Sequence, residues 1–215
     1  MTGVRSLVIL GAGTFAREVL EAVELGGTFE PVGFLVSDVA SLRSASHCGL
    51  PVSTLGECPW TPDRVSVIGG IVSTRRRAFV EAVADRGFTF AAVRHPAAIV
   101  SPRATIAPGT FIGAGVIIAS ETQVGAHVLI NRGANVGHDV VLEPFVTLGP
   151  GVTMAGAVSV GAGCYIGVGA VIRDHLPIGA GAVVAAGAVV VKPLAPHTLV
   201  AGCPAVVVKD GVDGL

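Results

Sequence analysis

The sequence predicts two parts of different fold class, a small parallel α/β domain over residues 1–93 and an all-β parallel β-helix over residues 94–215. Two observations predict this division. The first part alternates buried strand patterns with amphipathic helix patterns, which is typical of a parallel sheet. The second part repeats a six-residue pattern of aliphatic residues and glycine, which indicates short strands separated by tight turns.

The α/β part contains four strand patterns and two helix patterns. A buried strand at 7–10 leads through a glycine turn into an amphipathic helix within SLVILGAGTFAREVLEAVEL. Further strands are predicted at 31–38 and 64–70, a second helix at 74–87, and a last strand at 88–93. Because strands that alternate with helices pair in parallel, these residues are expected to form a small Rossmann-like sheet.

The second part has an unbroken six-residue period. Every sixth position from Val100 to Val190, sixteen in all, is aliphatic or Met, and the positions two residues earlier are small or aliphatic. Three such hexads close one triangular coil of 18 residues, so residues 100–195 are expected to make a little over five coils. Aliphatic side chains then fill the prism, and successive coils hydrogen-bond at a spacing of about 4.8 Å.

The glycine turn after the first strand is a candidate phosphate site. Gly11-Ala12-Gly13-Thr14-Phe15-Ala16 fits the G-x-G-x-x-A pattern, in which glycines let the backbone approach an anion at a helix N-terminus. The alternative is a strand-to-helix turn that needs glycine for its conformation alone. A domain of about 90 residues is too short for a complete dinucleotide fold, which favours a mononucleotide moiety.

Composition argues against several classes of protein. The net charge is −1 and the longest run of like charge is Arg75-Arg76-Arg77, so neither nucleic acid nor an anionic membrane is expected as a partner. The uncharged stretch 144–172 holds too many glycines for a membrane-spanning helix. No secretory signal is recognised, and the four cysteines form no CxxC. We therefore expect free thiols and a cytoplasmic protein.

His138 and Asp139 stand side by side in a stretch of packing residues. The inward positions of this hexad are aliphatic, so His138 is expected at a corner of the prism, facing outward, with Gly156 directly above it in the next coil. Asp139 would accept a hydrogen bond from one ring nitrogen, raise the pKa of the imidazole and leave the other nitrogen as a base. The Gly156 N–H would face a developing oxyanion. The alternative is a pair that caps a solvated turn.

The order of these parts resembles a known family. An α/β domain, then HPAAIVSPRA, then hexads, then an ending with Gly202-Cys203-Pro204-Ala205 is similar to the sialic-acid O-acetyltransferase-like hexapeptide-repeat acyltransferases, which include nucleotide-sugar N-acetyltransferases. The resemblance spans essentially the whole chain. It implies a left-handed β-helix, a homotrimer with active sites between neighbouring prisms, and acetyl-CoA as co-substrate without a required metal.

The family's motif N-x(6)-H-[DE] matches Asn131, His138 and Asp139. The resemblance makes His138 the general base, Asp139 its partner and Asn131 a residue of the acceptor site. Two positions depart from it: Gly137 stands where many members have Glu, and Thr147 where many have a second histidine that contacts acetyl-CoA. The resemblance implies an acyl-CoA site formed by Thr147, Gly156, Val168 and Ala186. It implies a nucleotide-sugar site formed by Gly11, Ala12, Gly13, Thr14, Phe15, Asp38, Gly69 and Asn131, with one arginine of 75–77 nearby.

The leading hypothesis is an acetyl-CoA-dependent N-acetyltransferase acting on a UDP-, dTDP- or GDP-linked 4-amino sugar by direct attack on the thioester. An O-acetyltransferase of a sugar hydroxyl and a non-catalytic binding scaffold stay open as alternatives. A zinc prism of the carbonic-anhydrase type is disfavoured, because His127, His138 and His175 are spaced by 11 and 37 residues rather than near 18. The remaining histidines are expected to be structural or superficial.

Overall fold

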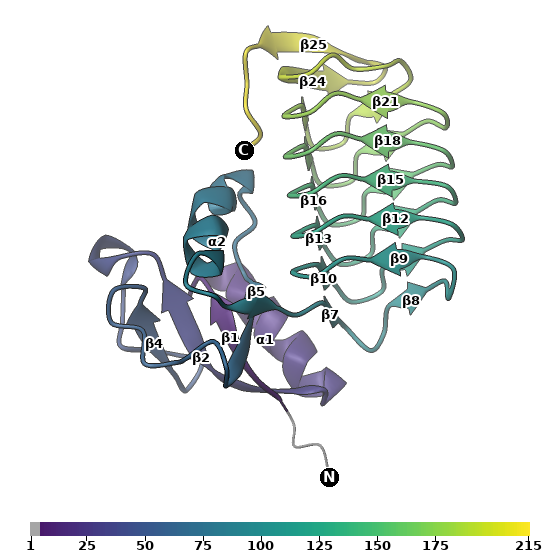
Figure 1. Ribbon diagram of the computed structural model, residues 1–215. Coiled ribbons are helices and arrows are strands. Elements are labelled where there is room, and N and C mark those ends of the chain that lie inside the picture. Colours follow the sequence, from purple (N-terminus) through teal and green to yellow (C-terminus); the bar gives the residue numbers. More distant parts are fainter. Residues whose placement is uncertain (1–4) are drawn as a thin grey trace.

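The computed structural model describes residues 5–215, in which an α/β part lies against one side of a triangular prism (Figure 1). The α/β part is a six-stranded sheet in the order β3-β4-β2-β1-β5-β6, parallel except for the β3–β4 hairpin. Its elements are β1 (Arg5–Leu10), α1 (Thr14–Gly26), β2 (Phe29–Val36), η1 (Val39–Ser41), β3 (Ser46–His47), β4 (Leu50–Thr54), β5 (Val65–Gly69), η2 (Thr74–Arg76), α2 (Arg77–Ala84) and β6 (Thr89–Phe90).

Helix α1 shows why the sequence folds as predicted here. Its apolar residues recur at helical spacing, and the face that contains Ala16, Val19 and Val23 is buried. The helix ends at Gly27, whose left-handed backbone (φ 61°) lets its N–H donate to the Val23 carbonyl at 3.2 Å. Glycine adopts this conformation without a steric penalty, so it is the usual residue at such an end.

The structure differs from the sequence prediction in three places. The short strands β3 and β4 and the 3-10 turn η1 were not predicted. The segment 74–87 begins as the 3-10 turn η2, and helix α2 covers only Arg77–Ala84. The predicted strand 88–93 is split: β6 joins the α/β sheet, whereas β7 (Val93–Arg94) pairs with the first full coil of the prism.

The prism has three faces, each a parallel sheet. Face 1 contains β7, β10 (Phe111–Ile112), β13 (Leu129–Ile130), β16 (Thr147–Leu148), β19 (Tyr165–Ile166), β22 (Val183–Val184), β24 (Thr198–Gly202) and the antiparallel β25 (Ala205–Asp210). Face 2 contains β8 (Ile99–Val100), β11 (Ile117–Ile118), β14 (Asn135–Val136), β17 (Thr153–Met154), β20 (Val171–Ile172) and β23 (Val189–Val190). Face 3 contains β9 (Thr105–Ile106), β12 (Gln123–Val124), β15 (Val141–Leu142), β18 (Ser159–Val160) and β21 (Pro177–Ile178).

The register of these strands confirms the six-residue period. Each residue pairs with the residue 18 positions later, as Ile117 does with Asn135. The second residue of each strand points into the prism together with the residue two positions before it, and nearly all of these side chains are buried in one apolar cluster. Only the first coil is looser, where Val100, Ala104 and Ile106 are half-buried.

The α/β part covers face 1 and leaves faces 2 and 3 open. Phe111 and Leu129 on face 1 are buried in the same cluster as Phe15 and Ala16 of α1. On face 2, by contrast, Ile99 is 66% exposed. Face 1 is thus a contact between the two parts of one chain, and the corner opposite to it, between faces 2 and 3, is accessible. No helix in the described part of the chain is long and apolar enough to span a membrane.

Candidate active site

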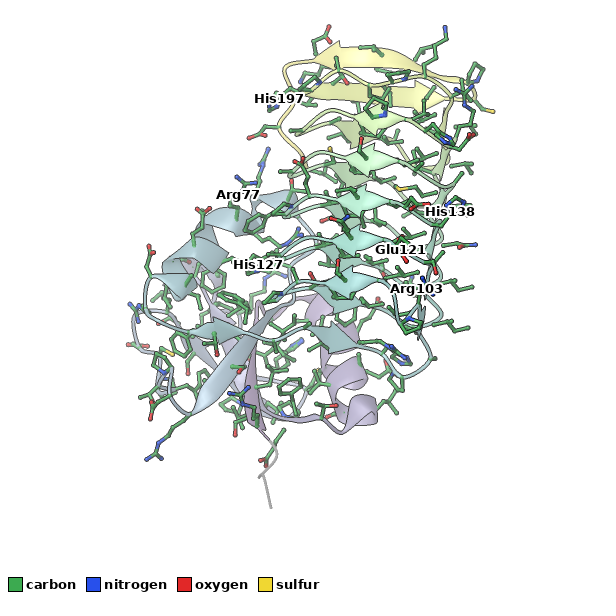
Figure 2. All side chains as sticks on the ribbon, turned by 45° about the vertical axis from the view of Figure 1, so that its right-hand side comes forward. Arg77, Arg103, Glu121, His127, His138 and His197 are labelled. Carbon is green, nitrogen blue, oxygen red and sulfur yellow. The ribbon has the colours of Figure 1, made fainter. Side chains whose placement is uncertain are left out.

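The corner between faces 2 and 3 carries His138 and Asp139, in the turn from β14 to β15. Figure 2 shows His138 above Glu121 and Arg103 along the prism edge remote from the α/β part. Asp139 adopts the left-handed conformation (φ 56°), which aspartate tolerates better than most residues. The side chains of His138 and Asp139 are 67% and 58% exposed, so a ligand can reach both.

The two side chains form the expected pair. His138 Nδ1 lies 2.7 Å from Asp139 Oδ2. A carboxylate accepts and does not donate when ionised, so this contact keeps the proton on Nδ1 and leaves the Nε2 lone pair free. An imidazole in this tautomer can take a proton from a nucleophile, which is the chemistry of a general base.

Gly156 forms the seat of the imidazole ring. A Cβ atom on Gly156 would lie 2.6 Å from Cε1 and 2.7 Å from Nε2 of His138, so only glycine leaves room for the ring in this position. The backbone around it is fixed, because Ala157 N–H donates to the His138 carbonyl at 2.9 Å. Within residues 5–215 the Gly156 N–H donates to no protein acceptor, and it therefore remains available for an oxyanion next to the base.

A second His–Asp pair lies on the same corner, which sequence reasoning did not single out. His175 Nδ1 is 2.8 Å from Asp174 Oδ2, and both side chains are exposed. The residue 18 positions after Asp174 is Lys192 rather than a glycine. This second pair therefore has a similar hydrogen bond without the bare backbone seat that the His138 ring has.

The glycine turn after β1 borders a cleft of about 680 Å³ in the α/β part. Gly11, Ala12, Gly13 and Thr14 line one side of it, with Arg43 and Arg75 also in its wall. Gly11 has φ 94° and a Cβ there would lie 2.6 Å from Ile71 Cγ1, so this position requires glycine. The N-terminus of α1, which has no acidic residue in its first turn, faces the same cleft. Backbone amides, a helix dipole and two guanidinium groups suit a phosphate ester.

Other residues predicted for the nucleotide-sugar site have different surroundings. Asp38 accepts hydrogen bonds from Ser41 N–H at 2.9 Å and from the Ser37 hydroxyl at 3.1 Å, and the backbone bond foremost lowers the pKa of this carboxyl. It caps η1, and its neighbours Ser37 and Ser41 line the cleft. The ring of Phe15 is buried edge-on against Phe111, 5.5 Å between centroids, so its side chain does not face the cleft.

Asn131 and Gly69 also lie apart from the cleft lining. Asn131 is buried at the end of β13, where its Oδ1 accepts from Arg132 N–H at 2.8 Å. Gly69 ends β5 and faces a small space beside His127 and Arg76. The structure does not bring either residue next to the Gly11–Thr14 turn within one chain.

The three consecutive arginines have three different environments. Arg76 is 4% exposed and donates to Thr147 Oγ1 at 2.8 Å and to the His127 carbonyl at 2.7 Å. Its burial lowers the pKa of the guanidinium to about 10. Arg77 lies over the Phe145 ring, 4.6 Å from the centroid, and Arg75 lines the cleft. The interpretation of this run as a solvated helical turn is wrong for Arg76, which joins the α/β part to the prism.

Thr147 has a different position from the one expected. It is fully buried on face 1, where its hydroxyl accepts from Arg76 and donates to the Val72 carbonyl at 3.2 Å. These contacts occupy the hydroxyl, and the α/β part covers the residue. Direct contact of Thr147 with acyl-CoA therefore does not fit the structure.

Val168 and Ala186 lie on another corner of the prism, between faces 1 and 2, and both are exposed. They stack 18 residues apart, where the bare backbone of Gly167 allows Ala186 N to approach. Gly156 lies on the corner between faces 2 and 3. One chain thus offers the predicted acyl-CoA residues at two corners that face 2 separates.

The remaining histidines have structural contacts. His127 stacks on Phe145 with ring centroids 4.9 Å apart, and burial, together with the charge of Arg76, lowers the pKa of its imidazole to about 4. His95 Nδ1 accepts from Ala97 N–H at 3.0 Å, and His197 Nδ1 is 2.9 Å from the Val212 carbonyl oxygen. Among residues 5–215 no three His, Cys, Asp or Glu side chains are grouped as metal ligands.

Comparison with known proteins gives matches among solved structures. No protein-family model and no curated sequence matches the chain. Perosamine N-acetyltransferase from Caulobacter crescentus, solved with CoA and GDP-perosamine, is 32% identical with a TM-score of 0.86, covering 97% of this chain and 99% of its own. The acetyltransferase domain of PglB from Neisseria gonorrhoeae, solved with acetyl coenzyme A, is 31% identical with a TM-score of 0.87, covering 96% and 100%. WeeI from Acinetobacter baumannii is 26% identical with a TM-score of 0.86, covering 95% and 100%.

Proposed function

Because the chain belongs to the hexapeptide-repeat, left-handed β-helix family of nucleotide-sugar N-acetyltransferases, we propose that its acceptor is the amino group of a UDP-, dTDP- or GDP-linked 4-amino sugar. The acyl donor is acetyl-CoA, which is the bound co-substrate in the PglB domain. The perosamine enzyme binds an acceptor of this class, GDP-perosamine. The cleft beside the Gly11–Thr14 turn offers this chain a place for the phosphates.

We assign the proton transfer to His138. The sugar amine attacks the thioester carbonyl carbon directly, and Nε2 of His138 takes the proton that the nitrogen loses. The Gly156 N–H donates to the oxygen that becomes negative as the C–N bond forms. When the tetrahedral intermediate collapses, the C–S bond breaks and the imidazolium returns the proton to the CoA thiolate. Asp139 holds Nδ1–H throughout, so the ring keeps its orientation and its charged form is stabilised.

We further propose that a neighbouring copy completes each site. In one chain the nucleotide cleft belongs to the part that packs on face 1, whereas His138 occupies the opposite corner. The predicted acyl-CoA residues likewise occupy two corners. A homotrimer with its prisms side by side lets the α/β part and one corner of one copy face the His138 corner of the next. The exposed apolar residues of face 2, such as Ile99 and Val171, support such packing.

The observation that carries the proposal is the His138 ring, held by Asp139 at 2.7 Å and seated on Gly156 at an open corner. The test is thiol release from acetyl-CoA with UDP-, dTDP- and GDP-linked 4-amino sugars and matching hydroxy sugars. The His138→Ala variant should lose at least about 100-fold in kcat. His175→Ala, which removes the other His–Asp pair of the same corner, should stay near the wild-type rate.

Each other result has a defined meaning. Full turnover by His138→Ala would show that the base is assigned to the wrong residue. Turnover with hydroxy sugars alone would identify an O-acetyltransferase. Light scattering measures the assembly independently, and a monomer that turns over at the full rate would contradict the shared site.

A further inference from the structure

Three side chains inside the prism bring polar atoms into an otherwise aliphatic core. Thr110, Thr122 and Cys164 are each fully buried at an inward position. Each donates a hydrogen bond to the carbonyl of a glycine 15 residues later: Thr110 Oγ1 to Gly125 at 2.8 Å, Thr122 Oγ1 to Gly137 at 2.7 Å, and Cys164 Sγ to Gly179 at 3.0 Å. A buried hydroxyl needs such a partner, so the bond explains how threonine is accommodated there.

The Thr122 bond differs from the other two in what its acceptor belongs to. The Gly137 carbonyl is part of the peptide unit that contains the His138 nitrogen. A hydrogen bond to this carbonyl from inside the prism therefore fixes the plane of the peptide that leads into His138. The other bonds of this turn are Gly137 N–H to the Met154 carbonyl at 2.9 Å and Asp139 N–H to the Ser120 carbonyl at 3.0 Å.

The position of the His138 ring has little tolerance for a tilt of that peptide. The ring lies against the bare backbone of Gly156, whose hypothetical Cβ would be 2.6 Å from Cε1. Gly137 itself is equally close to the next coil, since a Cβ there would lie 2.6 Å from the Ala155 carbonyl carbon. Rotation of the peptide plane would shift the direction of the Cα–Cβ bond of His138 and carry Nε2 away from the Gly156 N–H.

We propose that Thr122 is a positioning residue for His138, acting from the prism interior through the Gly137 carbonyl. The proposal rests on the proposed function, because it assumes that His138 is the base. Thr122 touches neither substrate. Its loss should therefore lower kcat and leave the KM values of both substrates nearly unchanged.

The test compares isosteric variants. Thr122→Val keeps the side-chain shape without the donor, and Thr122→Ser keeps the donor. Thr110→Val is the matched control, because it removes the same bond from an equally buried threonine at a corner without His138. We expect Thr122→Val to lose roughly 10- to 100-fold in kcat, as for a misplaced catalytic group, while Thr122→Ser and Thr110→Val keep the wild-type kcat. The two valine variants should show similar losses in melting temperature.

Thr122→Cys gives a second measurement, since the chain already carries a cysteine in the equivalent bond to Gly179. If Thr122→Val does not fold, an intermediate kcat for Thr122→Cys, below that of Thr122→Ser, supports the proposal. Wild-type kcat in Thr122→Cys and in a folded Thr122→Val would overturn it. A wild-type protein without turnover on any amino sugar would instead refute the proposed function, and an unchanged imidazole titration of His138 by NMR in Thr122→Val would then decide against positioning.

Discussion

Replacing Gly156 with alanine tests the seat of the His138 ring directly. The added Cβ would lie 2.6 Å from Cε1 and 2.7 Å from Nε2 of His138. Carbon atoms in contact are normally about 3.5–4 Å apart, so the ring must move by about 1 Å. A displacement of about 1 Å costs a positioned group roughly 100-fold in rate, which equals about 2.7 kcal/mol of activation free energy. We expect kcat to fall by about this factor.

The same substitution should leave the fold intact. The His138 side chain is 67% exposed, so the ring can swing into solvent, and the loss in unfolding free energy should stay below about 1 kcal/mol. Gly137→Ala is the contrasting variant, because its Cβ would meet backbone atoms, 2.6 Å from the Ala155 carbonyl carbon and 2.7 Å from Gly156 N. Backbone cannot swing aside, and overpacking of this kind costs about 1–3 kcal/mol.

Steady-state thiol release and urea unfolding of both variants measure these quantities. The prediction is a separation, with Gly156→Ala stable and slow and Gly137→Ala unstable. Wild-type kcat in Gly156→Ala would refute the argument that the ring position matters. A loss of stability in Gly156→Ala as large as in Gly137→Ala would show that the ring is not free to move.

Two further predictions concern the contact between the α/β part and the prism. Arg76→Lys should lower the unfolding free energy by about 3 kcal/mol in urea titrations, because one ammonium group cannot satisfy the carbonyls and hydroxyl that the buried guanidinium serves; Arg77→Lys, at the surface, is the control, and equal losses would contradict the assignment. Burial keeps the pKa of His127 at about 4 in the folded state against 6.5 for the unfolded chain, so protonation favours unfolding. Stability is therefore complete above pH 6.5 and falls as the pH drops towards 4; melting curves across this range should show a smaller fall in His127→Gln, and identical slopes would refute the cause.

The prism could be predicted from the sequence because each inward position imposes its own local requirement. An 18-residue coil has room for only small or aliphatic side chains at fixed steps, so the pattern at Ile112 recurs at Ile130 and Leu148 whatever the rest of the chain does. The corner position of His138 followed from the same count. These are requirements of spacing, which a linear sequence displays directly.

The contacts of Arg76 and Thr147 could not be predicted in this way. The two residues are 71 positions apart, and their bond depends on how the α/β part docks on face 1. The run of three arginines displays no difference among its members, although one is buried and two are not. The β3–β4 hairpin was missed for a related reason: its strands are short, and one of them, Ser46–His47, has only two residues.

The 18-residue register makes the length of the prism discontinuous. Ser120, His138 and Gly156 stack in one column because they are 18 residues apart. Removal or insertion of a whole coil away from this column changes the height of the prism and keeps every remaining side chain at its corner. A change of six residues before His138 turns the following chain by one third of a circle and carries the histidine to a different edge. We therefore expect evolution to alter the enzyme's reach in whole-coil steps, and its acceptor range through the α/β part, which is free of this constraint.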